Sequence, residues 1–213
     1  DWGHVTNPPS AGWLPDGEKV AFLGNPIDAL KQSQKNLWVV DKWGGTPECR
    51  TTGINLNVAG KHQFDMPIIA RDAPNLFISD DGENAYVPVQ DGGNKSIYRI
   101  GLSGDVDFEP VVEDARVCDI VGLKDNFIVM YISEFNDPGN LYLLDIDGSH
   151  ERQITDINQD LLDEFALPTI DNLLFSSIDG TEVEGWLIRP PFGQPPYPTI
   201  LYNHGGPDMA WGT

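Results

Sequence analysis

Three segments of the chain repeat one pattern of apolar and polar residues. In each, a polar turn with Asp beside Gly or Asn leads into an apolar strand, and a second strand follows with an aromatic residue in its third position. A glycine-bearing turn then leads into a third short strand. Short runs rich in β-branched and aromatic residues, bounded by such turns, predict antiparallel strands in three similar units. The first strands lie at 15–23, 79–87 and 123–131, the second at 36–41, 96–101 and 140–145, and the third at 48–52, 107–112 and 151–155.

The spacing inside the units supports a true repeat. The turn aspartate and the strand aromatic are equally far apart in the second and third units. In the first unit they are farther apart, and the extra polar residues at 25–35 predict a longer hairpin loop. A second insertion, at 54–74, separates the first unit from the second.

Repeated hairpins of this size are typical of the four-stranded blades of a β-propeller. A β-sandwich is the alternative, but it would not be expected to repeat one turn-strand-turn order with the same internal spacing. Propellers have about four to eight blades, so three cannot close a ring and we expect further blades before Asp1. We expect the repeated aromatics Trp38, Tyr98 and Tyr142 to pack between blades rather than to stack a ligand.

The repeat ends after residue 157. Apolar residues of segment 157–165 recur at helical spacing, which predicts a short helix that Pro168 ends. Residues 173–191 then predict a hairpin around an Asp179-Gly180 turn, and the proline-rich segment 191–198 predicts a surface loop. The segment Ile200–Tyr202 predicts a buried strand that leads into His204-Gly205-Gly206.

The His-Gly-Gly turn is the candidate for chemistry. Glycine leaves backbone N–H groups open to a ligand and allows backbone angles that other residues avoid. In α/β-hydrolases, one N–H of the oxyanion hole comes from the loop after the third strand, often with a sequence of this type. The alternative is a tight turn with no chemical role.

The context of this turn resembles one family of serine peptidases. Residues 176–191 read S-S-x-D-G-x-x-x-x-G-W-L-x-x-P-P, and residues 197–207 read Y-P-x-I-L-Y-x-H-G-G-P. Together with the blades, these motifs resemble the prolyl oligopeptidase family, in its acylaminoacyl-peptidase and dipeptidyl-peptidase branch. The resemblance implies a mainly β chain, with the C-terminal blades of a β-propeller over 1–168 and the N-terminal hairpin and strand of an α/β-hydrolase peptidase domain over 169–213.

The resemblance also implies roles for single residues. Gly206 would supply an oxyanion-hole N–H, Gly205 would permit the turn, and His204 would organise the loop without acting as the catalytic base. The nucleophilic Ser and the Asp and His of the triad are not in this chain, because it contains no G-x-S-x-G motif. The closest approach to that motif places Ser103 in a blade turn.

The remaining histidines do not suggest a triad. His4, His62 and His150 are expected in loops or blade turns. We therefore expect an inactive interior piece of a longer enzyme.

The family resemblance suggests that the complete enzyme is a serine exopeptidase or oligopeptidase. It would hydrolyse short peptides near their N-terminus, with the propeller gating access to the site. Glu134 and Asp137 are candidates to bind the amino group of the substrate. Two alternatives stay open: a non-catalytic propeller that binds a partner, and an HGG-type carboxylesterase.

Composition narrows the choice of partners. The 213 residues include 13 basic and 33 acidic ones, a formal net charge of −20. Such acidity argues against nucleic acid and anionic membranes as partners. No apolar run is long enough to span a membrane, and residues 1–10 show no signal peptide. We expect a short peptide substrate and the rest of the parent polypeptide as partners, while the oligomeric state is not readable.

The sequence also gives expectations about cofactors, the two cysteines and the cellular compartment. We expect no cofactor and no metal, because Cys and His do not occur at ligand spacing and the calcium-like segment 145–148 lacks the later glutamate. Cys49 and Cys118 could form a disulfide, but two buried thiols are the simpler interpretation. The acidity and the glycosylation triplet at 94–96 favour secretion over the cytoplasm.

Overall fold

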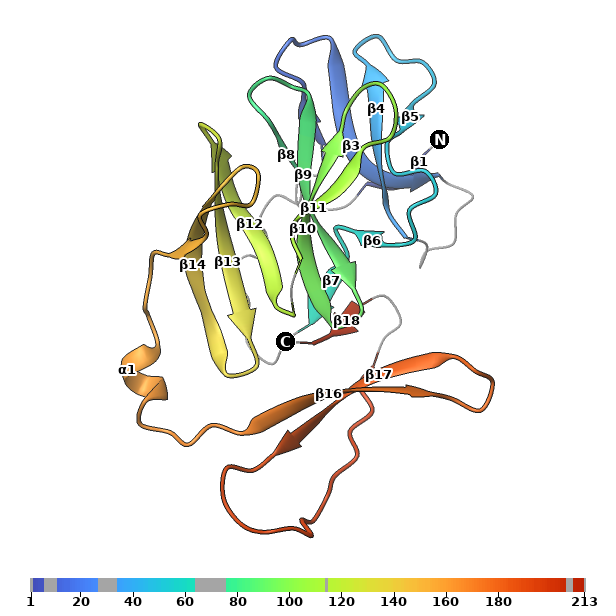
Figure 1. Cartoon of the computed structure of the whole chain (residues 1–213). Helices are drawn as coiled ribbons and strands as arrows, with labels where there is room; N and C mark the ends of the chain where they lie inside the picture. Colours follow the sequence, from blue (N-terminus) through green and yellow to red (C-terminus); the bar gives the residue numbers. More distant parts are fainter. Residues whose placement is uncertain are drawn as a thin grey trace.

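The structure is a computed structural model that describes residues 2–5, 11–26, 34–63, 76–113, 115–205 and 209–212. For residues 2–5, 26, 61–63 and 209 it describes the backbone only. Strands make up most of the described chain, and they form three blade-like sheets that stand side by side, with a separate hairpin across one end of them (Figure 1).

The first blade follows the order that the repeat predicts. Antiparallel strands β3, β4 and β5 correspond to the three predicted strands, and two short strands, β1 and β2, pair with the two halves of β3. The predicted long loop at 25–35 joins β3 to β4, although residues 27–33 lie outside the described residues. The bounds are β1 Trp2–Val5, β2 Ala11–Trp13, β3 Lys19–Pro26, β4 Asn36–Asp41 and β5 Glu48–Cys49.

The second and third blades have the same plan. Strands β9, β10 and β11 form the predicted hairpins of the second blade, and β13, β14 and β15 form those of the third. The two blades meet at a single parallel pair between Lys95 and Val117. The bounds are β6 Asn57–Val58, β8 Phe77–Ile78, β9 Asn84–Asp91, β10 Asn94–Gly101, β11 Phe108–Val112, β12 Val117–Lys124, β13 Phe127–Glu134, β14 Asp137–Asp145 and β15 Arg152–Gln153.

The strand that precedes these three in each blade was not predicted. In the third blade it is the continuous strand β12, which pairs with all of β13. In the second blade it is divided into β6 and β8, which pair with opposite ends of β9. The predicted insertion at 54–74 contains β6 and ends before β8, so the second blade forms its preceding strand partly from the insertion itself.

Two apolar clusters join the blades. The first combines buried residues of β3 and β4 with one face of β9 and β10, and the second combines the other face of β9 and β10 with β12, β13 and β14. Tyr98 is buried in the first cluster and Tyr142 packs against the second, as expected for aromatics that lie between blades. Trp38 is half-buried and its indole Nε1 donates to the Gly24 carbonyl at 2.9 Å.

A buried arginine also joins the first two blades. Arg50, which follows β5, is only 1% exposed. Its Nε donates to the Gly101 carbonyl at 2.9 Å, and its Nη atoms donate to carbonyls of the turn between β10 and β11 at 2.9 to 3.0 Å. The guanidinium therefore satisfies backbone carbonyls that the tight turn leaves without a strand partner. The turn acceptors are Ser103, Gly104 and Asp105.

The chain changes character after the third blade. Helix α1 (Gln159–Leu162) forms where predicted. However, the apolar residues in and beside it, Ile157, Leu161 and Phe165, are all more than half exposed. Strands β16 (Thr169–Ser176) and β17 (Glu182–Arg189) form the predicted hairpin as a separate two-stranded sheet. Among the described residues, no helix is both long and apolar enough to cross a membrane.

The expectation of a buried strand at Ile200–Tyr202 is wrong. Ile200–Tyr202 forms no strand, and its side chains are 91%, 84% and 74% exposed. Its backbone has no neighbouring strand among the described residues, and an extended segment needs such a partner to become a strand. The chain instead forms a later strand, β18 (Met209–Trp211), in parallel pairing with β7 (Lys61–Gln63).

Two histidines also lie in strands and not in loops. The backbone of His4 belongs to β1, and that of His62 belongs to β7. Both strands are short, and each pairs across a long sequence separation that local alternation does not reveal. His150 does lie in a turn, between β14 and β15.

Candidate functional site

The His-Gly turn is exposed and rests against a tryptophan. His204 and Gly205 follow the irregular segment and are open to solvent, whereas Gly206 lies outside the described residues. The His204 Nδ1 is 2.8 Å from the Gly205 carbonyl oxygen, so its N–H tautomer donates a hydrogen bond within the turn. The imidazole stacks on Trp211, with ring centroids 5.4 Å apart and planes 22° apart.

Trp211 connects this turn to the propeller side of the molecule. It belongs to β18, which pairs with β7, and its ring also meets Tyr202 edge-on at 6.3 Å. Its indole Nε1 is buried with no hydrogen-bond partner within the described part of the chain. The geometry is compatible with a loop-organising role for His204, and the roles of His204, Gly205 and Gly206 stay predictions.

The hairpin β16–β17 contacts the propeller through two side chains of β17. The Glu184 carboxylate accepts the Gly93 N–H at 2.7 Å and the Asn172 Nδ2 at 2.6 Å. Trp186 lies against Gly93 and packs at a tilt on Phe135, 5.7 Å between ring centroids. Because these contacts reach both the β9–β10 turn and the β13–β14 turn, the hairpin spans the ends of the second and third blades (Figure 1).

The two glycines of the β9–β10 turn make this contact possible. A Cβ on Gly92 would meet the Glu184 carboxylate, and a Cβ on Gly93 would overlap the Trp186 ring. Gly92 also has a φ of +57°, which side chains rarely adopt. On the third blade, the Asn136 Nδ2 donates to the Pro168 carbonyl at 3.0 Å, which holds the start of the hairpin.

The two acidic candidates lie in the neighbouring β13–β14 turn. Asp137 accepts the Gly139 N–H at 2.9 Å and the Asn140 Nδ2 at 3.1 Å, so its carboxylate holds the turn. Glu134 is exposed beside Phe135, at the blade end that the hairpin crosses. Glu134 is therefore the more available of the two for an amino group, although its role stays a prediction.

No Ser-His-Asp triad occurs among the described side chains. Ser103 lies in the exposed β10–β11 turn, as predicted, and its carbonyl is a partner of Arg50. His150 lies 2.8 Å from Asp145 Oδ2, and this hydrogen bond raises the pKa of the imidazole. The Ser149 hydroxyl lies 3.1 Å from the same nitrogen, Nδ1, so Ser149 and Asp145 do not occupy the two different ring nitrogens as a catalytic triad requires.

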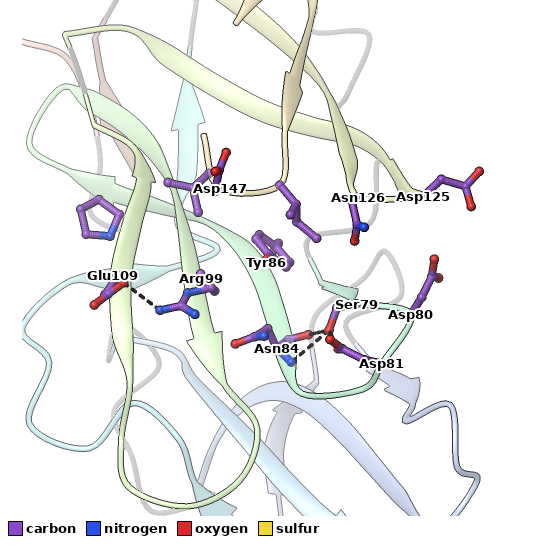
Figure 2. Close-up of a pocket in the computed structure, with 13 residues that line it drawn as sticks. Ser79, Asp80, Asp81, Asn84, Tyr86, Arg99, Glu109, Asp125, Asn126 and Asp147 are labelled. Carbon is purple, nitrogen blue, oxygen red and sulfur yellow. Dashed lines mark hydrogen bonds and ion pairs between the residues drawn. The ribbon is translucent and has the colours of Figure 1, made fainter. Parts of the chain in front are cut away.

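A second candidate site lies at the opposite end of the same blades. An open cavity of about 900 Å³ is lined by the β8–β9 turn, the β12–β13 turn, β11 and the end of β14 (Figure 2). Sequence reasoning identified the turn aspartates Asp81 and Asp125 as turn formers only. Their recurrence at one position of each repeat was the signal that these carboxylates gather at one end.

The described residues include side chains of the kinds that ligate metals, and both cysteines. No group of three or more His, Cys, Asp or Glu side chains is placed there to hold a metal ion. Cys49 and Cys118 are free thiols, Cys49 half-buried and Cys118 buried. The segment Asp145–Gly148 forms a hairpin turn, in which the Gly148 N–H donates to the Asp145 carbonyl at 2.9 Å.

Comparison with known proteins finds similarity to peptidases. No model of a protein family matches the sequence. The curated protein "Uncharacterized peptidase YuxL" of Bacillus subtilis (strain 168) is 27% identical over 179 residues, covering 82% of this chain and 27% of that protein. The chain thus spans about a quarter of the length of this relative.

Solved structures of peptidases share the fold. The acylaminoacyl peptidase of Pyrococcus horikoshii matches with a TM-score of 0.61 and 22% identity, over 84% of this chain and 24% of that one. An acylaminoacyl peptidase in complex with Z-Gly-Gly-Phe-chloromethyl ketone matches with a TM-score of 0.59 and 21% identity, over 82% and 24%. Together with the motifs at 176–191 and 197–207, these relatives support the identification of the chain as similar to part of a prolyl oligopeptidase-family peptidase.

Proposed function

We propose that this chain is part of a serine peptidase that hydrolyses short peptides near their N-terminus. In this proposal the blades restrict access to the active site, and residues after β15 begin the catalytic domain. The observation that carries it is the hairpin β16–β17, which Glu184 and Trp186 seat on the blade ends and which leads to the exposed His204-Gly205 turn. The peptidase names of the relatives support the same reaction class.

The proposed chemistry assigns a supporting role to the terminal turn. The Gly206 N–H would donate to the oxyanion of the tetrahedral intermediate, while Gly205 gives the turn its freedom and His204 holds it against Trp211. A donor of this kind lowers the barrier by about 3 to 4 kcal/mol where one has been removed by mutation. The nucleophile and its base would come from residues beyond this chain.

The exposed apolar residues around the turn support a further covering layer. Leu174, Ile200 and Leu201 are each more than 70% exposed, which is costly for large apolar side chains in water. We propose that the remainder of a hydrolase domain covers them. We also propose that the protein is secreted, and the acidic composition and the glycosylation triplet at 94–96 support this.

Active-site labelling with a fluorophosphonate tests this proposal. The probe forms a covalent bond with an activated serine, so the product of the complete gene should be labelled while the chain 1–213 alone should not. Labelling of the isolated chain would contradict the proposal, because it would place the nucleophile here. Absence of labelling in a folded product of the complete gene would favour a non-catalytic propeller that binds a partner.

A further inference from the structure

The cavity at the far end of the second and third blades has a strongly acidic lining. Five carboxylates and a single guanidinium line it. The Arg99 guanidinium is already paired, with Glu109 at 2.7 Å and with Asp107 at 3.0 Å. The other four carboxylates form no ion pair with any described residue. They are Asp80, Asp81, Asp125 and Asp147.

Two of these carboxylates are fixed in place by turns. Asp81 accepts the Ser79 hydroxyl at 2.6 Å and the Glu83 N–H at 2.9 Å, and Asp147 accepts the hydroxyl and N–H of Ser149 at 2.6 and 2.9 Å. These hydrogen bonds hold the pKa of Asp81 and of Asp147 below the usual range of a carboxyl group. Both groups are therefore anionic at neutral pH, on opposite sides of the cavity (Figure 2).

A buried tyrosine between them provides the second, independent observation. Tyr86 lines the cavity but is only 3% exposed. Its hydroxyl forms no hydrogen bond within the described residues, yet it is not among the fully enclosed polar atoms, so its small exposed part faces the cavity. Burial raises the pKa of Tyr86, Arg99 lowers it and the charges of Asp81 and Asp147 raise it, which agrees with a position between these side chains (Figure 2). The Tyr86 hydroxyl is therefore free to bond a ligand atom that enters the cavity.

The spacing of the charges restricts the kind of ligand. The described acidic side chains do not converge closely enough to hold a metal ion. A ligand that carries several positive charges along an extended chain can instead contact carboxylates on opposite sides of the cavity. Ammonium groups donate strong hydrogen bonds to carboxylates, and an acidic cleft raises the local concentration of such cations.

We propose that this cavity binds an extended organic polycation of the polyamine class. One ammonium group contacts the β8–β9 turn at Asp80 and Asp81, while Asp147 and Asp125, which lie on either side of Asn126 on the third blade, each contact a further ammonium group (Figure 2). The Tyr86 hydroxyl accepts a hydrogen bond from the ligand between these contacts. This inference is independent of the proposed peptidase activity, because the cavity lies at the blade ends away from the hairpin.

Titration calorimetry of the chain with spermidine tests the proposal. The double variant Asp80→Asn with Asp125→Asn removes two charges, and neither carboxylate accepts a hydrogen bond from a described residue. Asn also tolerates the left-handed backbone of Asp125, whose φ is +51°. We expect saturable binding of one spermidine by the wild type, and binding weakened by about tenfold or more in this variant, since each lost contact is a charge-assisted hydrogen bond.

The controls separate a site from general attraction to an acidic protein. The variant Asp156→Asn with Glu164→Gln makes the same change in charge at exposed positions near α1 and should leave affinity unchanged. Tyr86→Phe keeps the buried ring and should weaken binding by about threefold or more. Equal weakening by the α1 variant, no effect of Tyr86→Phe, binding without saturation, or displacement of spermidine by equimolar calcium would each overturn the proposal.

Discussion

Trp186 of β17 lies so close to Gly93 in the β9–β10 turn that a Cβ atom on this glycine would overlap the indole ring. The Gly93 N–H also donates to Glu184 at 2.7 Å. One residue without a side chain thus provides both an apolar contact and a hydrogen bond to the hairpin. The β9–β10 turn and the hairpin β16–β17 therefore match in both shape and hydrogen bonding at Gly93.

Replacing Gly93 by Ala should loosen the hairpin. The backbone at Gly93 is not in the left-handed region, so the effect would come from the contact with Trp186 and not from backbone strain. Overpacking of this kind costs about 1 to 3 kcal/mol. Hydrogen exchange of the amides in β16 and β17 should become faster, while exchange in β9 and β10 changes little. Gly122→Ala is the matched control, because nothing lies within 4 Å of its Cβ position.

Replacing Arg50 by Ala should destabilise the pair of blades that it joins. The change removes a buried side chain and leaves the Gly101 carbonyl and three carbonyls of the β10–β11 turn without their donor. We expect a loss of about 3 kcal/mol in the free energy of unfolding, measured by urea denaturation. Arg50→Lys should be intermediate because it keeps the charge but not the planar fork. An equal effect of Arg152→Ala, at an exposed position, would contradict this account.

The pair of His150 and Asp145 should respond to pH in one direction. The hydrogen bond that His150 donates to Asp145 raises the pKa of the imidazole, so the pair favours the folded state below the unfolded pKa of histidine, about 6.5. That contribution disappears as the pH rises through the higher folded pKa. In an NMR titration, Asp145→Asn should lower the pKa of His150 more than Asp147→Asn does. The reverse order would show that the hydrogen bond is not the main cause.

The repeat made much of the fold predictable. Strands β9, β10, β13 and β14 combine local alternation with turn residues at fixed places, so the sequence alone located them. In the second blade the preceding strand could not be found in this way, because it consists of β6 and β8, which are far apart in the sequence and only two residues long. Their pairing depends on β9 and not on local sequence.

The candidate sites were only partly predictable. The His204-Gly205 turn was identified from its residue types, but its contact with Trp211 depends on the pairing of β18 with β7, far apart in the sequence. The seat of the hairpin joins Gly93 to Glu184 across 91 residues, and no local pattern reports such a contact. The acidic cavity likewise required the spatial order of the blades.

Replacing His204 in the product of the complete gene separates its two possible roles. If His204 organises the loop, the variant His204→Ala should have a kcat/KM about 10- to 100-fold lower than the wild type, because the loop is no longer held in position. The acidic limb of the pH profile should stay unchanged. His204→Phe should recover part of the activity because it keeps the stacking on Trp211. Loss of the acidic limb together with a far larger loss of activity would make His204 the catalytic base instead.

The most direct test of the account is the hydrolysis of chromogenic substrates by the product of the complete gene. We predict that it cleaves p-nitroanilides of acylated amino acids and dipeptides, with kcat/KM above that of mutant protein in which the fluorophosphonate-labelled serine is changed to Ala. Stoichiometric binding of these peptides without turnover, or turnover of p-nitrophenyl esters alone, would contradict the peptidase assignment.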